Sequence, residues 1–394
     1  MRVLFLNERD LSHPLAGGVE VHLEEMASRL ASQCGIEPTV LCASFPGAAR
    51  EEKRRGIRYI RFGNRLSYYA MLPHRARALV KNEHFDVVIE ELCKVIVCSG
   101  LWLRGVPKLA LSHHLFGLSA FMQVAPPIAA WVLASETMLP LLYRRRPFVA
   151  VSPSSRDDLI KRGLPGERIR VVPNGLDHRL YAPGDRAQHE RNTVLFVGRL
   201  EHYKGADVLL DAWAGVRAKR PDARLILVGS GSAEGKLRAQ AARLGNGVTF
   251  AGFIPDEEKR DLMRRARLLV QPSFKEGWGL TVLEANACGT PVVATRVPGL
   301  RDSVRDGETG LLVPPGNSTA LAQGILRLLD DDTLHARLAT AALRWSAHFT
   351  WEAVTASFAE ILRAVAAGKP LPETPDYLQP DALGTPPLLA GEAR

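Results

Sequence analysis

The sequence predicts an α/β protein made of two doubly wound, Rossmann-like parallel-sheet domains facing a central cleft. Two observations carry this prediction: short, unbroken apolar runs alternate with helical segments, and the alternation pauses once near the middle of the chain. Unbroken apolar strands separated by helices are typical of parallel sheets that are covered on both faces. The length of 394 residues, with 46% hydrophobic and 24% charged residues, suits two globular domains better than one.

The expected strands form two series. The first comprises residues 3–6, 39–42, 87–89, 108–111 and 148–151, and the second comprises residues 194–197, 225–228, 248–251, 268–271 and 291–294. Between them, Pro, Gly, Asn and Asp accumulate over residues 173–192, which indicates a linker. We therefore expect an N-terminal domain over residues 1–175 and a C-terminal domain over residues 190–345. Ligands of such sheets bind beyond the carboxyl ends of the strands.

The remainder of the chain reads as helices followed by a tail. Residues 318–331 and 333–367 have helical patterns. Residues 368–394 are rich in proline and poor in large apolar side chains, which predicts a disordered tail.

The first residues and the cysteines favour a cytoplasmic protein. Residues 1–7 run directly into a strand-like stretch without the segments of a signal peptide. The five cysteines are odd in number and lack close paired spacing, so we expect buried free thiols rather than a disulfide framework or a zinc site; they are Cys34, Cys42, Cys93, Cys98 and Cys288.

The net charge of +9 is concentrated in residues 50–81, which hold ten lysines and arginines against two glutamates. No nucleic-acid motif accompanies this basic stretch, so nucleic acid is not expected as a partner, and an anionic membrane surface fits better. The apolar residues 115–143 are interrupted by Pro126, Pro127 and Glu136, so they do not span a membrane. They either lie on one as amphipathic helices beside Arg144–Arg146 or form a helical lid.

Two sets of residues suit the binding of a diphosphate. Gly17 and Gly18 follow the first strand and precede a helix, where backbone can approach a phosphate closely, although such a turn also uses glycine for its own geometry. Arg199 and Lys204 follow the strand at 194–197, and two cations at the end of a strand can close on a diphosphate. The alternative for this second pair is a solvated loop.

The strongest signal is the pair Glu276 and Glu284, eight residues apart around a Gly-aromatic-Gly turn. Glu276 is expected in a loop that faces the cleft, and Glu284 about one turn inside the following helix, where a carboxylate can accept two ribose hydroxyls. The turn and the helix start expose backbone N–H groups that can cradle a phosphate, those of Gly277, Gly279, Leu280 and Thr281.

The whole set of motifs resembles glycosyltransferase family 4, a large family of retaining enzymes with the GT-B fold. The resemblance covers about residues 1–365 and is carried by Gly17-Gly18-Val19-Glu20, Asn174-Gly175-Leu176-Asp177, Gly198-Arg199 with Lys204-Gly205, Glu276 with Glu284, Asp306-Gly307 with Gly310, and Phe349-Thr350-Trp351-Glu352.

The resemblance implies that residues 1–175 bind the acceptor, that residues 190–345 bind the nucleotide-sugar donor, and that the last helix, at about 346–365, braces the N-terminal domain. It also implies a role in donor binding for each matched residue. Arg199 and Lys204 bind the diphosphate, with Gly17 and Gly18 near the phosphates. Glu276 holds sugar hydroxyls, Glu284 holds the ribose, and Phe253 with its neighbours holds the base. One histidine of the doublet His113-His114, for which His113 is the first choice, is expected against the transferred sugar, and the alternative is a structural histidine at a strand end.

The expected reaction is metal-independent transfer with retention, in which the leaving diphosphate deprotonates the acceptor on the same face of the sugar. No metal or other cofactor is expected, since the acidic cluster Asp330–Asp332 lies in a helix-ending loop rather than at a strand end. The predicted donor is a UDP- or GDP-hexose, and the predicted acceptor is a glycan or lipid of the bacterial envelope at the inner face of the membrane. A soluble polyol or glycan acceptor is the alternative.

Three other functions compete with this prediction. The glycines Gly229, Gly231 and Gly235 after the strand at 225–228 suggest a nicotinamide-dependent oxidoreductase, but their spacing is wrong and no acidic residue follows the strand at 248–251. A sugar-nucleotide epimerase or phosphorylase would use the same fold, although the Glu276 and Glu284 pair favours transfer. A non-catalytic subunit that keeps the nucleotide site as a scaffold is the third.

Overall fold

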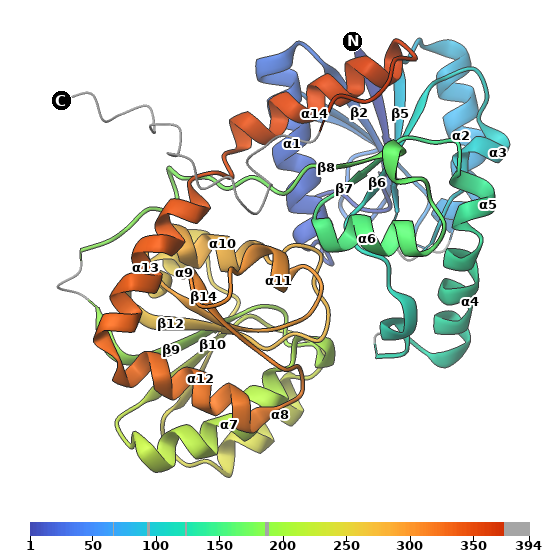
Figure 1. Ribbon diagram of the computed structural model, residues 1–394. Helices are drawn as coiled ribbons and strands as arrows, with labels where there is room; N and C mark the ends of the chain where they lie inside the picture. Colours follow the sequence, from blue (N-terminus) through green and yellow to red (C-terminus); the bar gives the residue numbers. More distant parts are fainter. Residues whose placement is uncertain (66, 93–94, 123, 186–188, 374–394) are drawn as a thin grey trace, which may run out of the picture. The chain divides into compact units, whose positions relative to one another are not determined.

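The computed structural model describes residues 1–65, 67–92, 95–122, 124–185 and 189–373 and divides into two compact units (Figure 1). The first unit runs from Met1 to Gly175, apart from a short stretch at 121–124, and includes the segment that begins at Trp351. The second unit contains Leu176–Thr350. The chain passes from the first unit to the second within the linker expected at 173–192. Cys93 and residues 374–394 of the expected tail lie outside the described residues.

Among the described residues, the sheet of the first unit has eight strands in the order β3-β4-β2-β1-β5-β6-β7-β8. Their bounds are β1 Arg2–Leu6, β2 Glu37–Ala43, β3 Glu51–Arg54, β4 Ile57–Phe62, β5 Val87–Leu92, β6 Lys108–Ser112, β7 Phe148–Ala150 and β8 Ile169–Val171. All neighbouring pairs are parallel except β3 and β4, which are antiparallel.

Helices cover both faces of this sheet. They are α1 Gly18–Cys34, α2 Ser67–Asn82, α3 Ser99–Trp102, α4 Pro126–Thr137, α5 Leu139–Tyr143, α6 Pro153–Lys161 and α14 Trp351–Ala366, with the 3₁₀ turns η1 Gly117–Met122 and η2 Gly166–Arg168. The last helix, α14, packs on α1 and against β5 and β6. A Cβ atom on Gly175 would lie 2.6 Å from the Trp351 ring. The residue at which the chain leaves the first unit is therefore in contact with the residue at which it returns.

The described sheet of the second unit is wholly parallel, in the order β11-β10-β9-β12-β13-β14. Its strands are β9 Glu190–Val197, β10 Arg224–Val228, β11 Val248–Gly252, β12 Ala266–Gln271, β13 Val292–Thr295 and β14 Gly310–Val313. Its helices are η4 His202–Lys204, α7 Ala206–Lys219, α8 Glu234–Ala242, α9 Asp256–Arg265, α10 Leu280–Ala287, α11 Leu300–Ser303, α12 Ser318–Asp330 and α13 Asp332–Ser346.

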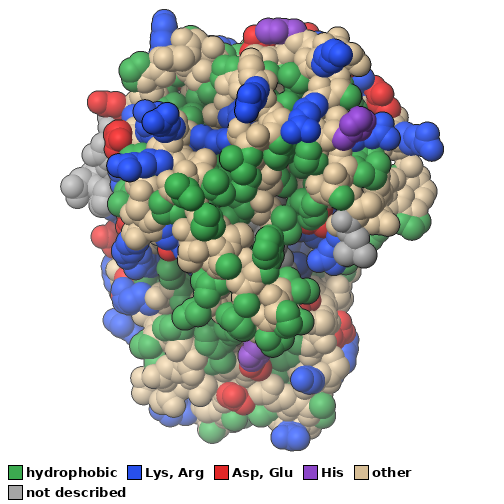
Figure 2. Space-filling model, turned by 90° about the vertical axis from the view of Figure 1, so that its right-hand side faces the viewer, with side chains coloured by type: hydrophobic (Ala, Val, Ile, Leu, Met, Phe, Trp, Pro, Cys, Tyr) green, Lys and Arg blue, Asp and Glu red, His purple; other side chains and the backbone are tan. Residues whose placement is uncertain are grey.

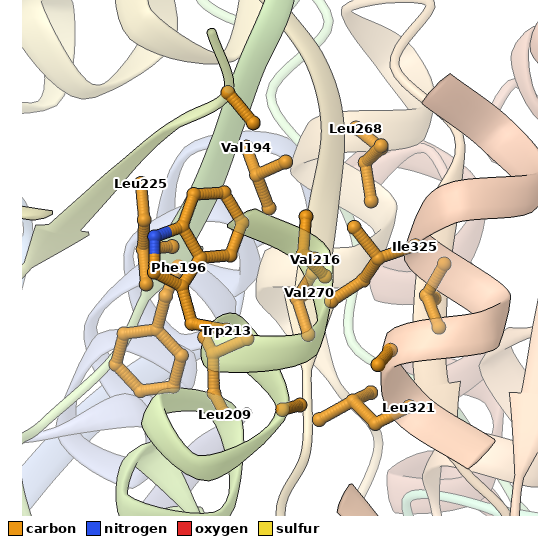
Figure 3. Packing of buried hydrophobic residues seen from close by; sticks show 14 of the residues in the cluster. Val194, Phe196, Leu209, Trp213, Val216, Leu225, Leu268, Val270, Leu321 and Ile325 are labelled. Atoms are coloured by element: carbon orange, nitrogen blue, oxygen red, sulfur yellow. The ribbon is translucent and has the colours of Figure 1, made fainter. Parts of the chain in front are cut away.

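Apolar residues spaced three and four apart on α7 explain the core of the second unit. Leu209, Trp213 and Val216 lie on one face of this helix and pack on the strand residues Phe196 and Val270 (Figure 3). The same core includes Leu321 and Ile325 of α12. The central strands β9 and β12 are held by this packing, and the loops that follow them carry the candidate site.

The predicted fold class is confirmed, since each unit is a largely parallel sheet covered by helices. All ten predicted strands are present, but β3, β4, β8 and β14 were not predicted. Two of the missed strands, β3 and β4, lie in the basic stretch, where cations interrupt the apolar pattern. Arg61 of β4 is nevertheless buried because its Nε donates to the Asp10 carboxylate at 2.6 Å.

Candidate functional site

Two loops meet at the carboxyl edge of the second unit's sheet, one after β9 and one after β12, which are neighbouring strands. The backbone N–H of Phe274 donates to the carbonyl of Tyr203 at 2.8 Å and ties the loops together. The first loop carries Arg199 and Lys204, and the second carries Glu276. Residues 72 positions apart in sequence are thus brought into contact.

Lys204 and Glu276 form the centre of this site. The ammonium of Lys204 donates to Glu276 Oε1 at 2.6 Å, and their side chains are 14% and 13% exposed. The same carboxylate accepts hydrogen bonds from Ser273 Oγ at 2.8 Å and from Gln271 Nε2 at 3.0 Å. Burial acts to raise the pKa of Glu276, but the Lys204 charge and the three hydrogen bonds outweigh it and lower that pKa below its ordinary value. Glu276 is therefore a fixed anion.

Gly205 allows Lys204 to reach this position. Its φ is +70°, and a Cβ atom there would lie 2.2 Å from the carbonyl oxygen of Pro272, immediately after β12. Only glycine combines this conformation with so close an approach of two backbones. The Lys204-Gly205 motif is thus explained by the contact between the two loops.

Tyr203 is a site residue that the sequence analysis missed. Its hydroxyl accepts a hydrogen bond from Arg199 Nη2 at 2.6 Å, and the Lys204 ammonium lies 5.3 Å from the centre of its ring. Tyr203 therefore separates the two cations and fixes the exposed Arg199 beside the half-buried Lys204. An aromatic residue between two predicted diphosphate ligands was the only available signal.

The start of α10 supplies backbone donors beside this pair. Gly279 is the residue before the helix, with φ +82°, and Leu280 and Thr281 are its first two residues. Their N–H groups have no acceptor within the helix, because the first turn of any α-helix leaves them unused. Together with Gly277, which precedes the buried Trp278, they form the turn predicted to cradle a phosphate.

Glu284 lies on α10 as predicted, but it already has a cationic partner. Lys259 of α9 places its ammonium 3.2 Å from the carboxylate of Glu284 and 2.8 Å from Asp256. The Tyr181 ring lies under the same ammonium, 5.2 Å from it. Neither Lys259 nor Tyr181 was predicted, since their relation to Glu284 depends on packing between segments far apart in the sequence.

Phe253 follows the edge strand β11 and is 86% exposed. A large aromatic ring open to solvent is available for stacking on a planar base. Its exposure is compatible with the predicted role of holding the base. That role stays a prediction.

The glycines that suggested a dinucleotide loop have a structural explanation. A Cβ atom at Gly229 would lie 2.0 Å from the carbonyl oxygen of Gly198, and one at Gly231 would lie 2.4 Å from that of Leu200. These residues let the β10 loop pack on the β9 loop, and Gly235 lies within α8. The pattern therefore arises from loop packing, which removes the main argument for an oxidoreductase.

In the first unit, Gly17 and Gly18 stand at the start of α1. Gly17 has extended backbone, and its N–H donates to Glu20 Oε2 at 2.6 Å, while Glu20 Oε1 lies 3.0 Å from Arg9. A Cβ atom at Gly18 would meet nothing within 4 Å, and neither glycine has positive φ. Turn geometry therefore does not require glycine at position 18, and the position that a Cβ atom would take there is unoccupied.

His113 follows β6 and is buried, as is His22 of α1. The two rings make an edge-to-face contact with centroids 5.0 Å apart, and His113 Nε2 has no hydrogen-bond partner among the described residues. Burial, with smaller contributions from His22 and His114, lowers the pKa of His113 well below its ordinary value, so the ring is neutral. His114 is half-buried and packs on Phe116, at 4.8 Å between ring centroids.

Within the described ranges, no group of three or more His, Cys, Asp or Glu side chains is arranged to hold a metal ion. In the acidic cluster at the α12–α13 junction, Asp331 accepts the Leu334 N–H at 2.8 Å and Asp332 binds Arg267 Nη2 at 2.6 Å. These residues cap and brace the helix. The described cysteines are free thiols.

Half of the ten cations in the basic stretch 50–81 are neutralised within the first unit. Five of its cations form ion pairs with acidic side chains: Arg54, Arg55, Arg58, Arg61 and Arg65. Several of the partners, including Glu24, Glu25 and Glu83, come from outside the stretch, so the sequence count overstated its exposed charge. No described helix is long and apolar enough to cross a membrane.

The chain matches two family models, one for each part. The model for Glycosyltransferase Family 4 matches residues 16–180, and the model for Glycosyl transferases group 1 matches residues 182–345. The two matches together span nearly all of the described chain.

Two relatives and one solved structure illustrate the similarity. A D-inositol 3-phosphate glycosyltransferase of Thermobispora bispora is 31% identical over 390 residues, covering 88% of this chain and 89% of that protein. A phosphatidyl-myo-inositol mannosyltransferase of Mycobacterium leprae is 38% identical over 200 residues, 50% of this chain and 53% of that protein. The sucrose-phosphate synthase of Thermosynechococcus elongatus is 25% identical, with a TM-score of 0.79 over 93% of this chain and 100% of that one.

These comparisons agree with the two parallel-sheet units and with the family resemblance inferred from the motifs. The chain belongs to glycosyltransferase family 4 and has the GT-B fold.

Proposed function

We propose that this glycosyltransferase moves a hexose from a UDP- or GDP-sugar to an acceptor hydroxyl, with retention and without a metal ion. The observation that carries the proposal is the Lys204–Glu276 pair, held beside the start of α10 and next to Arg199. This arrangement combines an anion suited to sugar hydroxyls with cations and N–H groups suited to a diphosphate.

The residues of the second unit would mainly stabilise the leaving group. As the bond between the anomeric carbon and the phosphate oxygen breaks, negative charge grows on the diphosphate, and Arg199, Lys204 and the α10 N–H groups would offset it. These groups would supply the stabilisation that other transferases obtain from a divalent cation. Glu276 would hold the sugar hydroxyls, and Glu284 the ribose.

The acceptor oxygen would attack on the face from which the diphosphate departs. Its proton would pass to the departing phosphate oxygen, so the protein would need no separate base and would act by positioning the two substrates. The neutral, buried His113 would hydrogen-bond the sugar through its unpartnered Nε2, and the open space at Gly18 would admit the phosphates.

For the acceptor, we propose a polyol or polyol-containing lipid presented at a membrane on the cytoplasmic side, as in biosynthesis of a bacterial envelope glycan. The names of the two relatives, one acting on an inositol phosphate and the other on phosphatidylinositol, support this acceptor class. A soluble polyol or glycan is the alternative, and the inositol phosphate enzyme supports it specifically.

An exposed apolar surface on the first unit supports an acceptor at a membrane. We define it by five large side chains on α3, η1, α4 and α5 that are 53% to 76% exposed: Leu101, Leu118, Ile128, Trp131 and Leu141. Figure 2 looks onto this side of the molecule and shows hydrophobic side chains gathered on it, with lysine and arginine side chains nearby. Exposed apolar patches of this kind mark protein or membrane contacts.

The charges beside this α3–α5 surface suit an anionic bilayer. Arg104, Arg144 and Arg145 are exposed, whereas Glu136 of α4 is buried and accepts the N–H groups of Phe116 and Gly117 at 2.6 and 2.9 Å. Exposed cations next to apolar side chains are typical of surfaces that bind anionic lipid.

The function is tested by titrating the protein with UDP, GDP and ADP in a thermal-shift assay, with and without chelator, and by measuring nucleotide release when donor and acceptor are mixed. We expect one nucleotide to raise the melting temperature equally with and without chelator, and loss of that effect in Glu284→Ala. Stabilisation by a nucleotide without any release on mixing would favour the scaffold subunit instead. A requirement for a divalent cation would contradict the metal-independent mechanism.

A further inference from the structure

Lys259 is a buried charge that the proposed reaction does not use. Its side chain is 15% exposed, and it lies on the first turns of α9, after the edge strand β11. A lysine costs free energy to bury unless its charge is compensated, so its surroundings indicate what it does.

Three groups converge on its ammonium. Glu284 contributes both carboxylate oxygens at 3.2 Å and Asp256 contributes one at 2.8 Å, while the Tyr181 ring lies 5.2 Å away. Burial acts to lower the pKa of Lys259, but the charges of Glu284 and Asp256 outweigh it and raise the pKa, so the lysine is a cation.

Tyr181 closes this arrangement from the segment that begins the second unit. It is buried, and the adjacent carbonyl of Ala182 accepts a hydrogen bond from Arg264 Nε of α9 at 2.7 Å. Burial together with the nearby charges of Glu284 and Asp256 raises the pKa of Tyr181, so its hydroxyl keeps its proton. The Lys259 ammonium is thus confined to one position.

The two carboxylate oxygens of Glu284 differ in their hydrogen bonds. Its side chain is 7% exposed; Oε1 accepts a hydrogen bond from Lys259, whereas the buried Oε2 lies 3.2 Å from the same ammonium without a hydrogen bond among the described residues. A buried carboxylate oxygen that lacks a hydrogen bond can accept one from a hydroxyl donor. The carboxylate also lies about one turn from the start of α10, where a diphosphate would bring negative charge, and a fixed cation beside it reduces the repulsion.

We propose that Lys259 is a positioning residue for Glu284, holding its carboxylate charged and oriented so that the donor's ribose, rather than a deoxyribose, is selected. The inference rests on the proposed donor site, and it assigns to Lys259 no direct contact with the nucleotide. Tyr181 and Asp256 hold the lysine in turn.

The test compares binding of a nucleoside diphosphate with binding of its 2′-deoxy form by isothermal titration calorimetry, using UDP, GDP and ADP as the probes. For the diphosphate that binds, we expect the wild type to prefer the ribose form by about tenfold, the usual value of a hydrogen bond to a charged group. Lys259→Met should bring the two dissociation constants to within about twofold of each other, as should Glu284→Gln.

Three further variants separate positioning from other roles. Lys259→Arg keeps a cation and should retain the preference, and Lys219→Met, the same change on an exposed lysine at the far end of α7, should leave it unaltered. In the Glu284→Gln background, Lys259→Met should cause no additional loss of discrimination, because the lysine acts through that carboxylate. Melting temperatures without nucleotide report any general destabilisation.

The outcomes are distinguishable. The positioning role is wrong if Lys259→Met keeps the preference for the ribose form. It is also wrong if Lys259→Met weakens binding of the ribose and deoxyribose forms equally, in the wild type and in Glu284→Gln. In either case the lysine is structural or contacts the diphosphate. If the wild type binds none of the three diphosphates, the proposed donor site fails and this inference fails with it.

Discussion

At the scale of single residues, the candidate site is built from charges that are buried in pairs. Lys204 with Glu276 and Lys259 with Glu284 each place an ammonium against a carboxylate with little exposure to water. Removing one member leaves the other buried without compensation, so substitutions here change more than one contact. Variants that preserve shape and remove charge, such as Glu→Gln and Lys→Met, are therefore the informative ones.

The buried histidine His22 predicts how stability depends on pH. Burial, opposed only by the Asn174 side chain, lowers its pKa from 6.5 to about 4. Between these two values the unfolded state binds a proton that the folded state does not, so the free energy of unfolding decreases as the pH falls through this window. The loss is up to about 1.4 kcal/mol per pH unit for one such histidine.

Replacing this histidine by glutamine should remove its share of that loss. We expect the melting temperature of wild type to fall more steeply than that of His22→Gln between pH 6.5 and pH 4.5. The difference between the two proteins at each pH cancels the contribution of His335, whose pKa is also lowered. Parallel curves for the two proteins would show that His22 does not titrate in this way.

At the scale of elements, the site depends on loops that approach each other more closely than side chains allow. Gly205→Ala should destabilise the protein by about 1–3 kcal/mol, because its φ of +70° and the nearby Pro272 carbonyl leave no room for a Cβ atom. The same substitution should displace Lys204 and so weaken nucleotide binding. Urea unfolding measures the change in stability, and calorimetry measures the change in nucleotide affinity.

Gly235→Ala is the matched control. This glycine lies within α8, has no positive φ, and would meet nothing within 4 Å on gaining a Cβ atom. The substitution should stabilise the protein by about 0.5–1 kcal/mol and leave binding unchanged. Equal behaviour of the two variants would mean that the contact at Pro272 does not hold the loop in place.

The elements also show what the sequence could predict. Strands that are apolar throughout, such as β9 and β12, were predicted because burial on both faces leaves a local pattern. β3 and β4 were missed because their cations are compensated by acids such as Asp10 and Glu24, which lie elsewhere in the chain. Glu276 and Glu284 were found by a local motif, whereas Lys259 and Tyr181 join the site only through tertiary packing.

At the scale of the whole molecule, the α3–α5 surface predicts how the protein meets a bilayer. We expect the wild type to float with vesicles that contain anionic phospholipid at low salt, since apolar insertion and exposed arginines act together. The double variant Ile128→Glu/Trp131→Glu should stay in the soluble fraction. Flotation in a density gradient measures the distribution.

The control for charge is Arg50→Glu/Lys53→Glu, which alters two exposed cations of the basic stretch on or next to the edge strand β3. It should float like the wild type. The reverse result, with the control released and the α4 variant bound, would move the contact to the basic stretch. A wild type that never floats would favour the soluble acceptor.

The return of α14 to the first unit has a consequence for how the protein is made. A ribosome completes the whole of Leu176–Thr350 before it adds Trp351–Ala366, so this part of the second unit is complete while the first unit still lacks a helix. Until α14 arrives, the face of β5 and β6 that it covers stays open. The unit that is synthesised first is therefore the one that finishes folding last, and a chain cut short after residue 350 would leave the nascent first unit exposed to chaperones and proteases.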